Sequence, residues 1–328
     1  MSYPLIILGA GASHDYAKHC DIPPPITKEL VARGYFNGDL LQKYPLTTGL
    51  LSEIESAVNT HGQGFEQALN NIKERSGHIA EIQAQLVALE FYLQDLFEKI
   101  SDGFQEINHY KSLQQRIISD CGGKACVVSF NYDSLFEDSI VGQNWKKMDD
   151  YVRGDLKVIK LHGSHNWSYI GNKEAMHFSG DYKGGYEFLT DNVDFITALR
   201  LKGGIDPYHK KELTGGNFFR FPALAIPLLS KQDITICPKR HIDVLCKELQ
   251  EVDRVLIIGW SASDNYLLGL IKKHAKRNIR FMLVSKEKIS AGKITTKIAK
   301  ATELIGESIS GGFGRFVGSE KYFNFFSK

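Results

Sequence analysis

Polar residues follow two short apolar runs of this sequence, at positions where a purely structural strand would simply turn. The run VVSF, residues 127–130, continues into Asn131 and Asp133, and the run LKVIKL, residues 156–161, continues into His162. An imidazole with an ordinary pKa can accept a proton at neutral pH. The three side chains are therefore candidates for a catalytic site. The alternative interpretation is structural: Asn131 and Asp133 can form an Asx-turn, and His162 can be a packed histidine.

Small residues follow two other apolar runs. GAGAS, residues 9–13, comes directly after PLIIL, and GWSASD, residues 259–264, comes after RVLII. Glycines at such a turn let the backbone approach a pyrophosphate closely, and a helix that starts there offers free N–H donors. The two turns together favour a nucleotide site, whereas one glycine-rich turn alone is also typical of a βα connection without a ligand.

Five short apolar runs predict the strands that position these residues. They are continuous rather than alternating, rich in β-branched residues and separated by long connections, as in a parallel sheet covered on both faces. The sequence predicts an α/β fold: a Rossmann-like sheet of about six mostly parallel strands with helices on both faces, whose carboxyl ends face the ligand. The runs span residues 4–8, 125–130, 156–161, 254–259 and 279–285, and a sixth strand is expected in ALAIPLL, residues 223–229.

Two long segments interrupt this pattern within what we expect to be one domain, residues 1–328. Residues 28–118 read mostly as helix, with an amphipathic stripe over 77–100, and predict a helical insertion after the first βα unit. Residues 170–222 contain GG pairs at 184, 203 and 215 with aromatic residues between them. This composition predicts an irregular loop or flap.

Composition excludes several classes of protein. The 328 residues are 43% hydrophobic, which is enough for a large core, and 40 basic against 38 acidic residues give a charge of only +2. Direct binding to nucleic acid or to a membrane is therefore not expected. The apolar N-terminal run is too short for a signal peptide or a membrane span, so we expect a cytoplasmic protein. The five cysteines form no C-x-x-C pair, which disfavours a disulfide framework and a zinc site, so no metal is expected.

In their order along the chain, these motifs resemble the sirtuin-like domains of bacterial antiphage defence. The motifs are GAGAS, IPPPITKEL, FNYDSLFE, KLHGSHNW, AIPLLSK and IIGWSASDNYL, and they cover residues 4 to about 268. The resemblance implies that Asn131 and His162 are the catalytic pair and that Asp133 holds the nicotinamide and ribose end of NAD. The NAD-binding residues that it implies are Gly9, Ala10, Gly11, Ala12, Ser13, Gly163, Gly259, Trp260, Ser261 and Asp264.

One departure from protein-deacylating sirtuins affects the expected reaction. Those enzymes carry two C-x-x-C pairs for a structural zinc and a GIPDFR-like segment after the glycines, and this chain has neither. Water then becomes the natural acceptor, and the resemblance implies hydrolysis of NAD to nicotinamide and ADP-ribose. It also implies a regulated defence effector, a homo-oligomer, and a partner protein such as a ring ATPase or a nucleic-acid-guided protein. The alternatives are a sensor that binds NAD or ADP-ribose without turnover, and a protein deacylase or ADP-ribosyltransferase.

Overall fold

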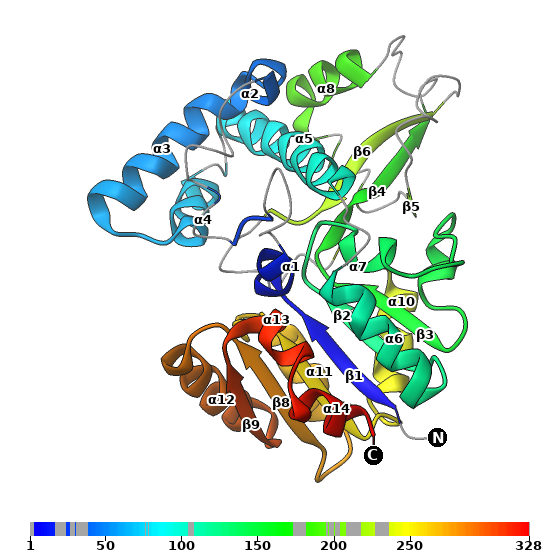
Figure 1. Ribbon diagram of the computed structural model, residues 1–328. Coiled ribbons are helices and arrows are strands. Elements are labelled where there is room, and N and C mark those ends of the chain that lie inside the picture. Colours follow the sequence, from blue (N-terminus) through cyan, green and yellow to red (C-terminus); the bar gives the residue numbers. More distant parts are fainter. Residues whose placement is uncertain are drawn as a thin grey trace.

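A parallel sheet forms the base of the molecule in the computed structural model (Figure 1). The structure describes residues 3–16, 24–26, 30, 39–75, 77, 79–103, 108–172, 182–194, 196, 200, 204–207, 218–226 and 236–327. Within these residues the sheet has six strands in the order β3-β2-β1-β7-β8-β9, and every neighbouring pair is parallel. The strands are β1 (Pro4–Leu8), β2 (Ala125–Ser129), β3 (Leu156–Lys160), β7 (Arg254–Ile258), β8 (Arg280–Ser285) and β9 (Ile305–Ser310).

The α/β, Rossmann-like fold expected from the sequence is confirmed, and five of its strands coincide with the five apolar runs to within one residue. The sixth strand is not ALAIPLL, because the described part of that run belongs to a separate antiparallel sheet. The sixth strand is β9, with the sequence IGESIS, at the edge of the main sheet. Its side chains are largely exposed, so it has no continuous apolar run that could identify it in the sequence.

The strands read as continuous apolar runs because each feeds a core on both faces of the sheet. In β1, Ile6 and Leu8 belong to one core and Leu5 and Ile7 to the other. The first core includes α6 (His109–Cys121), α13 (Gly312–Val317) and α14 (Glu320–Phe326), and the second includes α10 (Lys239–Glu248), α11 (Asn265–His274) and α12 (Lys288–Thr302). Figure 1 shows these two helix layers on opposite sides of the sheet.

A second group of elements, the cap, lies over the carboxyl edge of the main sheet (Figure 1). It contains α2 (Asp39–Lys43), α3 (Leu46–His61), α4 (Phe65–Arg75), α5 (Ala80–Asp102), α8 (Tyr182–Asp191) and an antiparallel sheet β5-β4-β6. The strands of that sheet are β4 (Gly163–Asn172), β5 (Ile205–Pro207) and β6 (Phe218–Leu224). Phe91 of α5 packs against both α8 and β6. The centroid of its ring lies 5.5 Å from that of Tyr186 and 5.6 Å from that of Phe221.

The cap differs from the two segments expected from the sequence. Helices α2 to α5 fall within residues 28–118, but α6, most of which also falls there, packs on the main sheet. Residues 170–222, expected to be an irregular loop, contain α8, β5 and most of β6. The GG pair at 184, which suggested a loop, lies inside α8, and the pair at 215 lies outside the described residues.

The remaining described helices are short or lie beside the sheet. They include α1 (Ala10–Tyr16) directly after β1, α7 (Leu135–Asp138) after β2, and a 3-10 turn at Met148–Tyr151. Within the described part of the chain, none of the helices combines the length and the apolar character that crossing a bilayer requires.

Candidate active site

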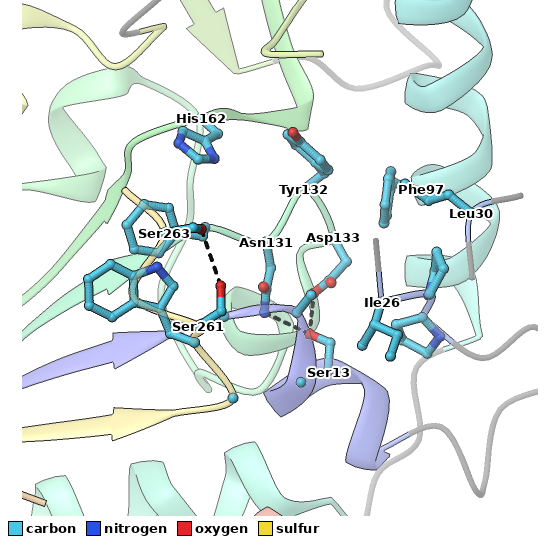
Figure 2. Close-up of a pocket in the computed structure, with 18 of the residues that line it drawn as sticks. Ser13, Ile26, Leu30, Phe97, Asn131, Tyr132, Asp133, His162, Ser261 and Ser263 are labelled. Carbon is cyan, nitrogen blue, oxygen red and sulfur yellow. Dashed lines mark hydrogen bonds between the residues drawn. The ribbon is translucent and has the colours of Figure 1, made fainter. Parts of the chain in front are cut away.

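A cavity lies at the carboxyl ends of the strands, where the main sheet meets the cap (Figure 2). The strand order reverses between β1 and β7, and ligands of doubly wound sheets bind at such a reversal. Residues of the main sheet line one side: Gly9, Ala10, Gly11, Ser13, Phe130, Asn131, Tyr132, Asp133, His162, Gly259, Trp260, Ser261 and Ser263. The rest of the wall comes from Pro24, Pro25, Ile26, Leu30, Glu66 and Phe97.

The two glycine turns pack backbone against backbone. The N–H of Gly9 donates to the carbonyl of Ile258 at 2.9 Å, and the N–H of Gly11 donates to the carbonyl of Gly259 at 3.0 Å. A Cβ on Gly9 would lie 2.5 Å from the Gly259 oxygen. The close contact between the two backbones is therefore sufficient to require glycine, without any ligand. The N–H of Ala12 is also engaged, by the carbonyl of Gly9 at 2.9 Å. The expectation that this turn offers its N–H donors freely is therefore wrong for Gly11 and Ala12.

Gly259→Ala is expected to destabilise the chain by at least about 3 kcal/mol. Gly259 has a φ of +63°, and its Cβ would lie 2.2 Å from the backbone nitrogen of Ala12. Gly62 is a matched control, because it has a φ of +61° and nothing within 4 Å of an added Cβ. Chemical unfolding should show a cost of only about 1–2 kcal/mol for Gly62→Ala. Equal costs for the two variants would contradict the backbone contact.

Asn131 lines the cavity and has a buried side-chain carbonyl oxygen. Its side-chain nitrogen donates to Ser13 Oγ at 2.9 Å and to the Tyr110 hydroxyl at 3.3 Å. These two contacts fix the orientation of the amide, and Figure 2 shows the one with Ser13. The residue is 6% exposed, and its Oδ1 atom is buried and has no hydrogen-bond partner among the described residues. A buried acceptor of this kind is costly unless a ligand or a water satisfies it.

Asp133 is a buried carboxyl group beside Asn131. Its Oδ1 accepts hydrogen bonds from Ser13 Oγ at 3.1 Å and from the N–H of Leu135 at 3.2 Å. The second bond is the Asx-turn at the start of α7, so the structural interpretation of this residue also holds. Burial is the main reason that the pKa of Asp133 is raised, from its usual 3.8 to about 6. Asp133 is thus ionised at neutral pH although burial opposes the charge.

Asp264 fixes the orientation of His162. Its Oδ2 lies 3.0 Å from Nε2 of His162, and both side chains are buried. The same carboxylate caps α11, because Oδ1 accepts a hydrogen bond from the N–H of Leu267 at 2.8 Å. A carboxylate so placed accepts a hydrogen bond from Nε2–H, which leaves the lone pair of a neutral ring on Nδ1.

An aromatic stack supports His162 from below. The ring of Phe130 contacts the imidazole with a centroid distance of 4.9 Å, and Trp260 stacks on Phe130 at 5.1 Å with an interplanar angle of 5°. The loop that carries Trp260 also contains Ala262 in the left-handed region, with a φ of 54°. Backbone strain of this kind tends to occur at functional sites.

The structure brings most of the expected site residues to this one cavity. Asn131, Asp133 and His162 lie there together with seven of the expected NAD-binding residues: Gly9, Ala10, Gly11, Ser13, Gly259, Trp260 and Ser261. Three expected residues do not line it. Ala12 is fully buried, Asp264 lies against His162, and Gly163 begins β4 with its Cα packed on the carbonyl of Ala223.

Several residues of the site were not expected from the sequence. Tyr110 on α6 reaches the site through its hydroxyl, and its pKa is raised well above 10, chiefly by burial. Phe97 of α5 and Glu66 of α4 come from the cap. Figure 2 shows Ile26, Leu30 and Phe97 on the side of the cavity away from His162. Ile26 and Leu30 belong to the IPPPITKEL motif, whereas nothing in the sequence near Tyr110, Phe97 or Glu66 indicates that they meet the ends of distant strands.

The described residues contain no group of three or more His, Cys, Asp and Glu side chains that could hold a metal ion. The described cysteines, Cys121, Cys126, Cys237 and Cys246, are free thiols. Burial raises the pKa of each of these four thiols.

Comparison with known proteins finds similarity only among solved structures. No protein-family model and no curated protein matches the chain. A triple mutant of a Sir2 homologue in complex with 2'-O-acetyl ADP ribose is 12% identical, with 96% of this chain and 89% of that chain covered and a TM-score of 0.47. A Sir2 homologue in complex with NAD is also 12% identical, with coverage of 96% and 86% and a TM-score of 0.43. At such low identity the activities of these proteins do not transfer to this chain.

Proposed function

We propose that this chain is an NAD glycohydrolase, which converts NAD and water into nicotinamide, ADP-ribose and a proton. The observation that carries the proposal is the buried Oδ1 atom of Asn131, which has no hydrogen-bond partner in the described part of the chain and belongs to the same cavity lining as Asp133 and His162. An acceptor held at a fixed orientation can bind the attacking water or a ribose hydroxyl. The position of the cavity at the reversal of strand order suits a dinucleotide.

Asp133 supplies the negative charge that the reaction needs. The bond between ribose and nicotinamide breaks to give neutral nicotinamide, so the leaving group requires no general acid, and positive charge develops on the ribose. A buried carboxylate stabilises such a charge more strongly than a carboxylate in water does. Its pKa of about 6 keeps Asp133 ionised at neutral pH.

His162 is the proton acceptor in this proposal. The Asp264 carboxylate 3.0 Å from Nε2 favours one tautomer and stabilises the imidazolium that forms when the other nitrogen takes a proton. The proton comes from the attacking water or from a ribose hydroxyl. In this proposal Asp264 acts through His162, whereas the motif resemblance implied that it binds NAD directly.

The motif resemblance supports the wider biological proposal. It favours a regulated effector of antiphage defence, present as a homo-oligomer in the cytoplasm and acting with a partner protein such as a ring ATPase or a nucleic-acid-guided protein. Unregulated hydrolysis of NAD would be toxic, which is a reason to expect control of the activity.

The proposal is tested by incubating the purified protein with NAD and measuring nicotinamide and ADP-ribose by chromatography. We expect the two products in equal amounts, and a loss of at least about 100-fold in turnover for His162→Ala. His61→Ala, at an exposed position of α3, is the control and should keep full turnover.

Other outcomes of this assay support other functions. Release of nicotinamide only with an acyl-lysine peptide or another protein acceptor would indicate a deacylase or a transferase. NAD binding without release of nicotinamide, both for the chain alone and with its partner, would indicate a sensor.

A further inference from the structure

A buried pair of opposite charges lies directly beneath the site. Nζ of Lys160, the last residue of β3, is 2.7 Å from Oε1 of Glu137 on α7, and the two side chains are 0% and 1% exposed. Removing two charges from water is costly, and apolar residues of similar size often serve stability equally well or better. Stability alone is therefore a weak reason for an ion pair at this place.

The pair contacts the loop that carries the candidate catalytic residues. Nζ of Lys160 also donates a hydrogen bond to the backbone carbonyl of Asp133 at 2.5 Å. The segment after Lys160 holds the same loop, because Ser164 Oγ and the N–H of His165 both donate to the carbonyl of Tyr132, at 3.2 and 2.9 Å. The ends of β2 and β3 are thus joined through Lys160 and the residues that follow it.

The charges of the pair act on the Asp133 carboxyl group in opposite directions. The Lys160 ammonium lowers the pKa of Asp133, and the Glu137 carboxylate raises it by a smaller amount. The net effect of the pair opposes burial, which is the largest influence on this pKa.

We infer that the Lys160–Glu137 pair is a positioning element of the active site, which fixes the loop of Asp133 and keeps the Asp133 carboxylate negatively charged. The inference deepens the proposed function and rests on it for the role of that carboxylate. Neither charge of the pair lines the cavity. In this inference the pair nevertheless helps to set the charge state of Asp133.

Other groups near Asp133 are accounted for in the test. The hydroxyl of Tyr110 stays neutral, because its pKa is raised well above 10. Among the described residues, the other titratable groups near Asp133 or on the same cavity are Glu66 of α4, Tyr132, Asp138 of α7 and His162 after β3. They stay in place in the variants below, but Lys160 lowers and Glu137 raises the pKa of Asp138, so the effect of the pair on Asp138 is measured in the Asp133→Asn background.

The first variant replaces both charges, Lys160→Met together with Glu137→Leu, and the readout is the free energy of unfolding measured against pH. When the pKa of a carboxyl group is raised in the folded state, the free energy of unfolding falls as the pH rises from the unfolded pKa to the folded pKa. Without the pair, this loss should extend to a higher pH than in the unaltered protein. The shift should be much smaller when both proteins also carry Asp133→Asn, because the carboxyl group of Asp133 is then absent and only the effect on Asp138 remains.

Glu137→Gln alone is the second variant, and it decides the question if the double replacement does not fold. It removes the charge that raises the pKa of Asp133 and leaves Lys160 in place. The stability loss should then end at a lower pH than in the unaltered protein. The exposed ion pair Lys321–Glu307, with side chains 52% and 58% exposed, provides the control Lys321→Met with Glu307→Leu, which should cause no shift.

Two results would overturn the inference: unshifted stability profiles for both variants, or shifts of the same size in the Asp133→Asn background. Nicotinamide release gives a separate readout. For a tenfold change in the acid constant of Asp133, turnover of the double variant at pH 6 relative to pH 8.5 should fall about fivefold. An unaltered protein that releases no nicotinamide would contradict the proposed function, while the stability profiles would still decide the role of the pair.

Discussion

Asn131→Ala is expected to lower the turnover of NAD by at least about 100-fold and to leave the chain folded. The variant removes the buried Oδ1 acceptor, which has no hydrogen-bond partner among the residues that the structure describes and which we propose binds water or a ribose hydroxyl. It also removes the hydrogen bonds to Ser13 and Tyr110, at a cost in stability of less than about 2 kcal/mol. Nicotinamide release at saturating NAD, together with a thermal unfolding curve, measures both effects.

The effect on the apparent affinity for NAD separates chemistry from binding. An interaction that is made in the transition state lowers kcat and leaves KM nearly unchanged. Asn71→Ala on the exposed face of α4 is the matched control and should preserve both constants. A large rise in KM with an unchanged kcat would show that Asn131 only binds the substrate, and full activity would remove it from the mechanism.

The position of the site could be predicted from the sequence because parallel strands bring their carboxyl ends together. Asn131 and His162 are far apart in the sequence, but each follows a continuous apolar run, and such runs indicate strands that are buried on both faces. The glycine turns were recognised in the same way. The sequence predicted glycines there for a close approach to a pyrophosphate. In the structure, Gly9, Gly11 and Gly259 are required by the contact between the two backbones.

The supporting residues could not be predicted, because their partners are set by tertiary packing. Tyr110 lies on the apolar stripe of α6, and nothing in its own sequence shows that its hydroxyl meets Ser13 and Asn131. The cap could not be placed over the site either, because helical periodicity identifies a buried face but not its partner. Asp264 reads as a helix N-cap, and its second contact with His162 depends on the fold of a neighbouring loop.

Lys160 is the exception, because the sequence does contain a signal for it. The run LKVIKL is a buried strand with a lysine one residue before its last position. Lysine is almost never fully buried unless it is paired, so a lysine there predicts a buried acidic partner. The partner, Glu137, is the last residue of the FNYDSLFE motif.

Asp133→Asn is expected to abolish most of the turnover and, at the same time, to stabilise the protein. Burial raises the pKa of Asp133 from 3.8 to about 6, so keeping the folded carboxyl group ionised at neutral pH costs about 3 kcal/mol. Asparagine can keep both hydrogen bonds that Oδ1 accepts, from Ser13 and from Leu135, without carrying a charge. The stability gained should therefore approach about 3 kcal/mol above pH 7.

The pH dependence of this gain distinguishes a buried charge from an unrelated improvement in packing. The unfolded chain releases the proton near pH 3.8 and the folded chain near pH 6. The gain should therefore be absent below about pH 4, grow between pH 4 and 6, and be complete above about pH 7. Unfolding by urea at several pH values measures it, with Asp243→Asn at an exposed position of α10 as the control. A gain independent of pH would contradict the buried charge, whereas a gain with this profile and a loss of turnover would show that the site keeps a costly carboxylate for its chemistry.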